Sequence, residues 1–195
     1  MEIIMKKLAL ATSLFLALGT AQASEAPKWD FVDASYLSTK IEGERLNGLG
    51  LSASKLINEN VFALGSYSYQ TWSEGDQEID LSSFTAGVGY RHAVAENTDV
   101  FGTIEYVYAN VDVAYDDKSG GSDSENGYGA KLGVRSMLTN EIEVQGVVNY
   151  VNLDGSDTSY TVKGLYHINT QFSVGAGFTK ADDADTYSVT AAYYF

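Results

Sequence analysis

The sequence predicts an all-β protein that folds as a closed antiparallel ten-stranded transmembrane β-barrel, an up-and-down meander. Three observations predict this class. Beyond residue 25, apolar residues recur at every second position, and no stretch keeps an apolar stripe at helical spacing for long. The chain has 19 Gly, 14 Tyr and 8 Phe but a single Pro, which suits strands that are not interrupted. The alternating segments number ten, and an even number of strands is typical of bacterial outer-membrane barrels.

The first 23 residues, MEIIMKKLALATSLFLALGTAQA, have the layout of a cleaved secretory signal peptide. Two lysines precede an apolar run that is shorter than a comfortable membrane span. Ala21 and Ala23 form a small-x-small cleavage site, so cleavage leaves Ser24 as the first residue. A buried N-terminal helix fits this layout less well, and Met5 is an alternative start to Met1.

We therefore expect a signal peptide at residues 1–23 and one outer-membrane β-barrel domain at residues 24–195. Removing one Glu and two Lys with the signal peptide changes the net charge from −14 to −15. Such an acidic chain offers no basic patch to release the counterions of a nucleic acid, so we expect no nucleic-acid partner. The chain has no Cys, which excludes disulfide and thiolate chemistry, and we expect no cofactor.

The ten alternating segments are each long enough to cross the hydrocarbon of a bilayer. In order, the predicted strands lie at about 28–38, 45–56, 60–72, 79–91, 99–114, 126–137, 141–153, 158–168, 171–180 and 186–195. In the same order, the apolar residues that share one face are Val32, Ala34 and Tyr36; Leu49, Leu51 and Ala53; Val61, Ala63, Tyr67 and Tyr69; Phe84, Ala86, Val88 and Tyr90; Val100, Ile104, Tyr106 and Tyr108; Tyr128, Ala130, Leu132 and Val134; Val144, Val148 and Tyr150; Tyr160, Val162 and Tyr166; Phe172, Val174, Ala176 and Phe178; Tyr187, Val189, Ala191, Tyr193 and Phe195. The third segment fits least well, because Phe62 and Leu64 on its other face are also apolar.

The composition of the two faces indicates that the apolar face meets lipid. The other face is rich in Gly, Ser and Thr, which suits the crowded interior of a narrow barrel. Tyr lies toward the strand ends, where its ring meets lipid and its hydroxyl meets water. A soluble β-sandwich would need a polar outer face with more Lys and Glu. An eight-stranded barrel is the architectural alternative, and it requires the paired segments within 28–56 to fail as strands.

The connections between segments alternate in character. Those after the second, fourth, sixth and eighth segments are short and carry Asn at turn positions. The others carry more acid, and the longest is predicted as a solvated loop over residues 116–125. This loop does not fit the EF-hand template. It remains open whether the acidic loops only keep the surface hydrophilic, share divalent ions with lipopolysaccharide phosphates, or bind a receptor.

Residues 24–195 resemble the small outer-membrane β-barrel superfamily typified by the membrane domain of outer membrane protein A, especially its ten-stranded porin-like members. The resemblance rests on the patterning, the turns and the final YYF. It implies the outer membrane of a Gram-negative-type bacterium, reached by signal-peptide export. The implied partners are outer-membrane lipid and lipopolysaccharide, with periplasmic chaperones and the barrel-assembly machinery during biogenesis, and we expect a monomer. In this family a C-terminal aromatic row is the assembly signal, which corresponds here to Tyr187, Val189, Tyr193 and Phe195.

The inward-facing positions carry a set of polar and charged residues: Asp33, Arg91, Glu105, Lys131, Arg135, Gln145, Asn149 and Lys163. One interpretation is a charged constriction that selects ions. The favoured interpretation is a hydrogen-bonded network that fills the lumen, since ten strands enclose only slightly more space than eight. If the fifth and sixth segments pair around a loop centred near residue 120, Glu105 lies beside Arg135.

Catalysis is not indicated. Surface enzymes of this architecture, proteases or lipid A-modifying enzymes, need a His base near the outer rim. The chain has two His, and His92 and His167 both lie beside short turns, where we interpret them as interfacial anchors. We therefore expect a non-enzymatic barrel that supports envelope integrity or surface interaction. A narrow porin-like channel for ions or small solutes is the alternative, and an enzyme is less favoured.

Overall fold

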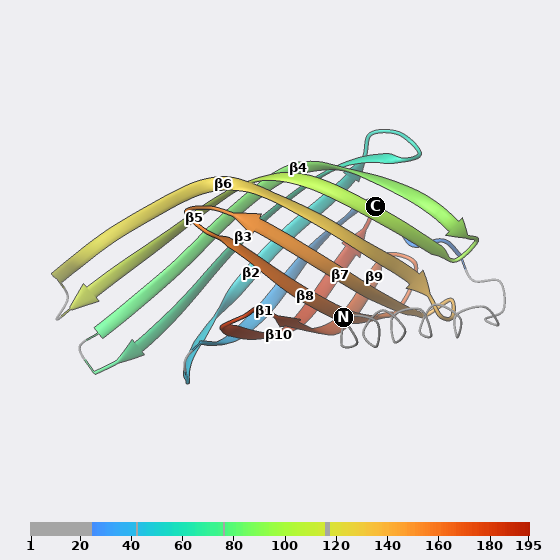
Figure 1. The fold of residues 1–195 in the computed structure, drawn as a ribbon. Helices are drawn as coiled ribbons and strands as arrows, with labels where there is room; N and C mark the ends of the chain where they lie inside the picture. The colour runs from blue at the N-terminus through green and yellow to red at the C-terminus, as the bar shows by residue number, and fades with distance from the viewer. Residues whose placement is uncertain (1–24, 42, 76, 116–117) are drawn as a thin grey trace, which may run out of the picture.

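The computed structural model describes residues 25–41, 43–75, 77–115 and 118–195, and within them the chain forms a ten-stranded closed barrel (Figure 1). The strands are β1 Phe31–Ile41, β2 Glu44–Leu56, β3 Val61–Glu74, β4 Gln77–Ala95, β5 Thr98–Tyr115, β6 Lys118–Met137, β7 Ile142–Asn152, β8 Ser156–His167, β9 Phe172–Lys180 and β10 Ala184–Tyr194. Each pairs antiparallel with the next, and β1 pairs with β10 to close the wall. The prediction of ten strands is confirmed, and the eight-stranded alternative is wrong. The predicted signal peptide lies outside the described residues.

The pleat puts the predicted apolar face on the outside of the barrel. Leu132, Ile104 and Val189 are 71%, 68% and 63% exposed, although each lies in the middle of a strand. An apolar surface of this extent is stable only against lipid or a partner. Closure leaves no strand edge along the paired wall, which a bilayer requires because its core offers no water to unpaired backbone groups.

The two ends of the barrel differ in strand length and in the form of their connections. We call the end with connections 57–60, 96–97, 138–141 and 168–171 the turn end, and the opposite end the hairpin end. In three of the turn-end connections a side-chain oxygen caps the turn: Asn58 Oδ1, Thr139 Oγ1 and Asn169 Oδ1 each accept two backbone N–H bonds. This is the local hydrogen bonding that favours Asn and Thr in turns.

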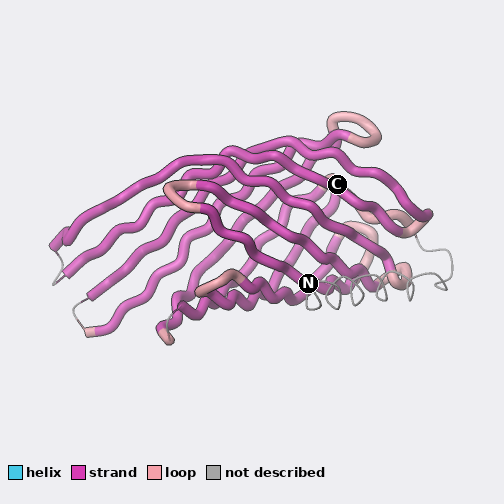
Figure 2. Tube along the Cα trace, in the orientation of Figure 1, coloured by secondary structure: helices cyan, strands magenta, loops and turns pink. Residues whose placement is uncertain are grey.

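The strands β4, β5 and β6 extend beyond the rest of the barrel at the hairpin end (left in Figure 1), and loops are confined to the two ends (Figure 2). β6 pairs with β5 from Lys118 onward but with β7 only from Tyr128. The predicted loop over 116–125 is therefore wrong for residues 118–125, which are strand. The alternating apolar pattern did not predict this part of the strand, because its residues are small or polar and cover no apolar surface.

The first strand begins three residues later than predicted, at Phe31 instead of residue 28. The reason is that the preceding residues turn into the barrel at the turn end, where Trp29 is buried. Phe62, which made β3 hard to predict, is 2% exposed and lies against the Trp29 ring inside the barrel. The described residues contain no helix long and apolar enough to cross a membrane.

Candidate functional site in the barrel lumen

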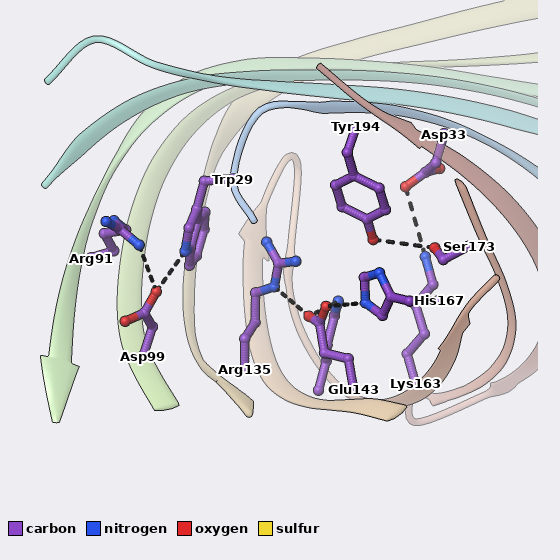
Figure 3. Close-up of polar contacts among 11 residues, drawn as sticks. Trp29, Asp33, Arg91, Asp99, Arg135, Glu143, Lys163, His167, Ser173 and Tyr194 are labelled. Atoms are coloured by element: carbon purple, nitrogen blue, oxygen red, sulfur yellow. Dashed lines mark hydrogen bonds and ion pairs between the residues drawn. The ribbon is translucent and has the colours of Figure 1, made fainter. Parts of the chain in front are cut away.

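Trp29 occupies the lumen at the turn end and is the centre of an aromatic and ionic cluster (Figure 3). Its side chain is 4% exposed, and its Nε1 donates a 2.6 Å hydrogen bond to Asp99 Oδ2. The rings of Phe62 and Phe101 lie 4.5 and 5.2 Å from its ring centroid. The Arg135 guanidinium lies over the same ring at 4.6 Å, a cation–π contact. Trp29 therefore joins the N-terminal segment to the interior of the wall.

Two glycines make room for the phenylalanines of this cluster. Phe62 lies directly opposite Gly89, and Phe101 directly opposite Gly133, on the neighbouring strands. A Cβ on Gly89 would lie 2.2 Å from the Phe62 ring, and one on Gly133 would lie 2.6 Å from the Phe101 ring. Each ring thus occupies the space that a side chain at the opposite glycine would fill.

Polar contacts hold the segment that carries Trp29 against the mouth of the barrel. Lys28 Nζ donates to the Thr170 carbonyl at 2.5 Å, and Lys55 Nζ donates to Asp30 Oδ2 at 2.7 Å. Partial burial favours the neutral form of Asp30, but the bonds from Lys55 and from the Leu56 N–H hold the pKa of Asp30 below its usual range. Residues 28–30 are therefore fastened on both sides of Trp29.

Asp99 is the acid that sequence reasoning missed beside Trp29. It is 1% exposed, and its Oδ2 also accepts a 2.8 Å bond from Arg91 Nη1. Its Oδ1 is buried without a protein hydrogen-bond partner among the described residues. Asp99 lies an even number of residues from Glu105 on β5, so the period-two pattern already placed both on the inner face.

The second missed acid, Glu143, joins three side chains from three neighbouring strands (Figure 3). Its Oε1 accepts bonds from Arg135 Nε at 2.7 Å and from Gln145 Nε2 at 2.9 Å. Its Oε2 lies 3.1 Å from His167 Nε2. Glu143 is 0% exposed and Arg135 is 3% exposed, so this is a fully buried ion pair. It shares the inward parity of Gln145, which was the signal that could have revealed it.

His167 is not an interfacial anchor, which corrects the sequence-based interpretation. It is 7% exposed and lies inside the barrel, where its ring centroid is 5.2 Å from that of Tyr194 in a tilted arrangement. Ser173 lies opposite His167 in register, but its Oγ bonds to Tyr194 Oη at 3.2 Å and the residue is 1% exposed. A Ser, a His and a Glu thus lie near one another, and all three are buried. His92 lies exposed on the outer face at the turn end, where the anchoring interpretation remains a prediction.

The other predicted lumen charges form two separate ion pairs. Glu105 accepts from Lys131 Nζ at 2.8 Å and from Thr103 Oγ1 at 2.6 Å. Lys163 Nζ lies 3.7 Å from Asp33 Oδ2. The expected proximity of Glu105 and Arg135 is wrong: Glu105 lies opposite Gly129, and Arg135 lies opposite Asp99. The β5–β6 hairpin turns near residue 117 instead of 120, which shifts the register of the two strands.

Toward the hairpin end, the lumen is lined by uncharged hydroxyl groups. Pairs of Ser and Thr side chains bridge neighbouring strands at 2.8 or 2.9 Å: Ser35 with Thr190, Ser66 with Thr85, Ser68 with Ser83, and Thr161 with Thr179. The predicted lumen residue Asn149 is bonded to Ser159 at 3.4 Å. The lumen therefore changes from ion pairs and aromatic rings at the turn end to a hydroxyl-lined wall.

Between these parts lies a cavity of about 160 Å³. It is lined by Trp29, Ser54, Lys131, Arg135 and Gln145, among others. The Ser54 Oγ that faces this region is buried and has no hydrogen-bond partner among the described residues. Its lining is mixed, with the rings of Trp29, Phe62 and Phe101 beside the polar side chains of Ser54, Lys131 and Gln145.

The ion pairs in the lumen are matched one to one. Four carboxylates, Asp33, Asp99, Glu105 and Glu143, each pair with one of four cations, Lys163, Arg91, Lys131 and Arg135. These eight side chains together therefore carry no net charge. In the part of the chain that the structure describes, no group of three or more His, Asp and Glu side chains has the arrangement of a metal site.

Comparison with known families places this barrel among membrane proteins. The family model described as "Outer membrane protein beta-barrel domain" matches residues 8–195. The chain belongs to this family. It is accordingly an outer-membrane β-barrel of Gram-negative bacteria. In such barrels the longer protrusions are extracellular and the shorter ones are periplasmic. The strands β4, β5 and β6 extend furthest at the hairpin end, so we expect the hairpin end to be extracellular and the turn end periplasmic.

Several solved structures share this architecture at low sequence identity. The translocator domain of autotransporter NalP from Neisseria meningitidis aligns over 100% of this chain and 96% of its own, at 12% identity and a TM-score of 0.51. The NanC porin aligns over 84% and 100%, at 8% identity and a TM-score of 0.53. Ail of Yersinia pestis, the attachment invasion locus protein, aligns over 87% and 98%, at 15% identity and a TM-score of 0.44. Curated proteins give no match. At these identities the likeness shows the fold alone.

The predicted assembly residues lie on the outer face of β10 and just beyond it. Tyr187, Val189, Tyr193 and Phe195 are 56%, 63%, 37% and 57% exposed. The intervening Thr190 and Tyr194 are buried in the lumen. The row therefore presents its side chains to lipid, and its role as an assembly signal remains a prediction.

Proposed function

We propose that this protein is a non-enzymatic outer-membrane barrel whose lumen is closed at the periplasmic end by residues 25–30. Its role is then to support envelope integrity or surface interaction instead of transport. The observation that carries this proposal is the position of Trp29, which is 4% exposed inside the lumen and bonded to the opposite wall through Asp99.

Three further features support a closed barrel. The Arg91–Asp99 and Arg135–Glu143 ion pairs join neighbouring strands beside Trp29, and breaking either would leave a buried carboxylate without its cation. The hydroxyl pairs beyond them join neighbouring strands and stiffen the wall. Neither His92 nor His167 lies at the hairpin end, where a surface enzyme would meet its substrate.

A narrow channel is the second candidate function, and the cavity beside Lys131 and Arg135 favours it. The cavity is about 160 Å³ and lies next to Trp29, so that movement of this one side chain would lengthen the open part of the lumen. In this alternative, the N-terminal segment is a gate instead of a permanent plug.

Conductance across planar bilayers tests the proposal. The wild-type protein should give no steady channels, because Trp29 and its ion pairs fill the periplasmic end. Trp29→Ala should give steady channels or frequent openings, since it removes the largest side chain in the constriction and leaves Asp99 with one partner fewer.

Trp72→Ala is the matched control. It removes the other of the two Trp side chains, whose Nε1 bonds to Glu44 at the hairpin end, far along β3 from the constriction. This variant should behave as the wild type does. Steady wild-type channels of one definite size would contradict the closed barrel and favour the channel.

A further inference from the structure

The cations of this acidic protein are distributed unevenly. Of 12 Lys and Arg, two lie in the segment 1–23 and four form the lumen ion pairs. Lys28 and Lys55 lie at the turn end, and the side chain of Lys118 is outside the described residues. The remaining three cations, Lys40, Arg45 and Lys180, are all exposed.

These three cations lie in one row across four neighbouring strands at the hairpin end. Lys180 of β9 pairs in register with Asp185 of β10, Asp185 with Lys40 of β1, and Lys40 with Arg45 of β2. All four residues share the outward parity of the lipid-facing residues below them. The row therefore faces away from the lumen, and binding there is independent of whether the lumen conducts ions.

The row carries more positive than negative charge. Lys180 forms a 2.7 Å ion pair with Asp185. Among the described residues no ion pair joins Lys40 or Arg45 to a carboxylate, and Arg45 Nη1 makes only a 3.3 Å contact with Ser38 Oγ. Other acids lie nearby: Glu44 accepts a bond from Trp72, Asp182 and Asp183 form the β9–β10 hairpin, and Glu42 is outside the described residues. Within the described ranges, Lys40 and Arg45 are thus without a carboxylate partner.

The tyrosines beneath the row indicate its depth in the membrane. Tyr187 and Tyr36 face outward on β10 and β1, at 56% and 51% exposure. The Tyr187 ring contacts Phe178 at 5.1 Å. Outward Tyr residues mark the interface between hydrocarbon and headgroups. With the hairpin end extracellular, as the long extensions of β4–β6 predict, the cations lie at the headgroup level of the outer leaflet, which in this membrane is formed by lipopolysaccharide.

We propose that Lys40, Arg45 and Lys180 bind the headgroup phosphates of lipopolysaccharide on this side of the barrel. Arg45 offers a planar fork of N–H donors that matches phosphate oxygens, and Lys40 adds a second charge beside it. Lys180 contributes less, since Asp185 already holds it. The strands β9, β10, β1 and β2 end just above the row, so the wall leaves room for a large headgroup. The taller, acidic β4–β6 sector carries no such row in its described residues.

The test measures binding of labelled lipopolysaccharide to the protein, purified from outer membranes into nanodiscs of zwitterionic lipid. Lys40→Gln combined with Arg45→Gln should weaken binding about 25-fold, since each cation near an anionic lipid surface contributes about five-fold. Lipopolysaccharide stripped of its phosphates should bind the wild type as weakly as intact lipopolysaccharide binds this variant.

Two further variants make the test specific: one should strengthen binding, and the other is a control that should not change it. Asp185→Asn should strengthen binding several-fold, because it removes the one carboxylate of the row and frees Lys180. Lys28→Gln combined with Lys55→Gln removes two cations at the periplasmic end and should leave binding unchanged. Equal weakening by this control would overturn the proposal, as would unchanged binding by the first variant. Complete displacement by inorganic phosphate would also overturn it, since the site would then take a free anion instead of the lipid.

Discussion

Arg135 shows at the residue scale how the lumen charges depend on one another. Its Nε bonds to Glu143, and its guanidinium lies over the ring of Trp29. The period-two pattern predicted that Arg135 faces inward. It did not predict either partner. Glu143 lies eight residues away across the β6–β7 turn, and its contact with Arg135 depends on the register of that hairpin. Trp29 comes from the segment before β1, which no spacing relates to Arg135.

Removal of Arg135 should be costly. Arg135→Ala leaves Glu143, which is 0% exposed, as a buried charge held only by Gln145 and His167, so the free energy of unfolding should fall by about 3–5 kcal/mol. Urea titration of the folded and unfolded gel bands, after refolding into lipid vesicles, measures this loss.

The double variant Arg135→Met with Glu143→Leu is the control. It removes both charges and should recover most of the lost stability, because a buried pair is often replaced by apolar residues at little cost. A single variant that loses less than about 1 kcal/mol would show that the pair is hydrated and not buried.

At the scale of elements, β3 and β4 show how a glycine on one strand makes room for an aromatic ring on the next strand. Phe62 made β3 look irregular, since it is an apolar residue on the polar face. The structure explains it, because Phe62 covers Gly89 on one side and contacts Trp29 on the other. A lone sequence cannot distinguish such an inward aromatic residue from a break in the strand pattern.

A side chain at position 89 should disturb the packing of the Phe62 ring against this position. Gly89→Ala places a Cβ 2.2 Å from the present Phe62 ring, which must then move toward Trp29, at a cost of about 1–3 kcal/mol. The fluorescence of Trp29, read in a Trp72→Phe background, should shift to the red as its surroundings loosen.

Gly164→Ala is the matched control for this substitution. Gly164 also lies within a strand, β8, but a Cβ there would meet nothing within 4 Å. It should leave both the stability and the emission of Trp29 unchanged. Equal effects of the two substitutions would mean that strand glycines matter here only through backbone freedom.

At the scale of the whole molecule, the barrel is asymmetric along its axis. The turn end carries Trp29 and the buried ion pairs, and the hairpin end carries hydroxyl groups within the lumen, the cation row outside it and the extended β4–β6 sheet (Figure 1). The sequence indicated two different ends through the alternation of its connections. The sequence pattern did not predict how far the β5–β6 hairpin extends, because the outer half of β6 is polar on both faces.

The orientation of this asymmetry can be measured in intact cells. The chain has no native Cys, so single cysteines report their own positions. Ser124→Cys, exposed on the outer part of β6, should react with a membrane-impermeant maleimide added outside. Asn140→Cys, exposed in a turn-end connection, should react only after the outer membrane is opened. The reverse labelling pattern would show that the barrel has the opposite orientation, and the cation row would then not lie in the outer leaflet.

The sequence by itself determined the fold class, the number of strands and the face that most strand side chains take. This was possible because a strand repeats every two residues whatever its neighbours are, and because lipid requires an apolar outer face on every strand. Only the tertiary structure decided which inward charges meet. The pairing of Glu105 with Lys131, the burial of His167 and the insertion of Trp29 depend on hairpin register and on chain entry, which no local pattern records.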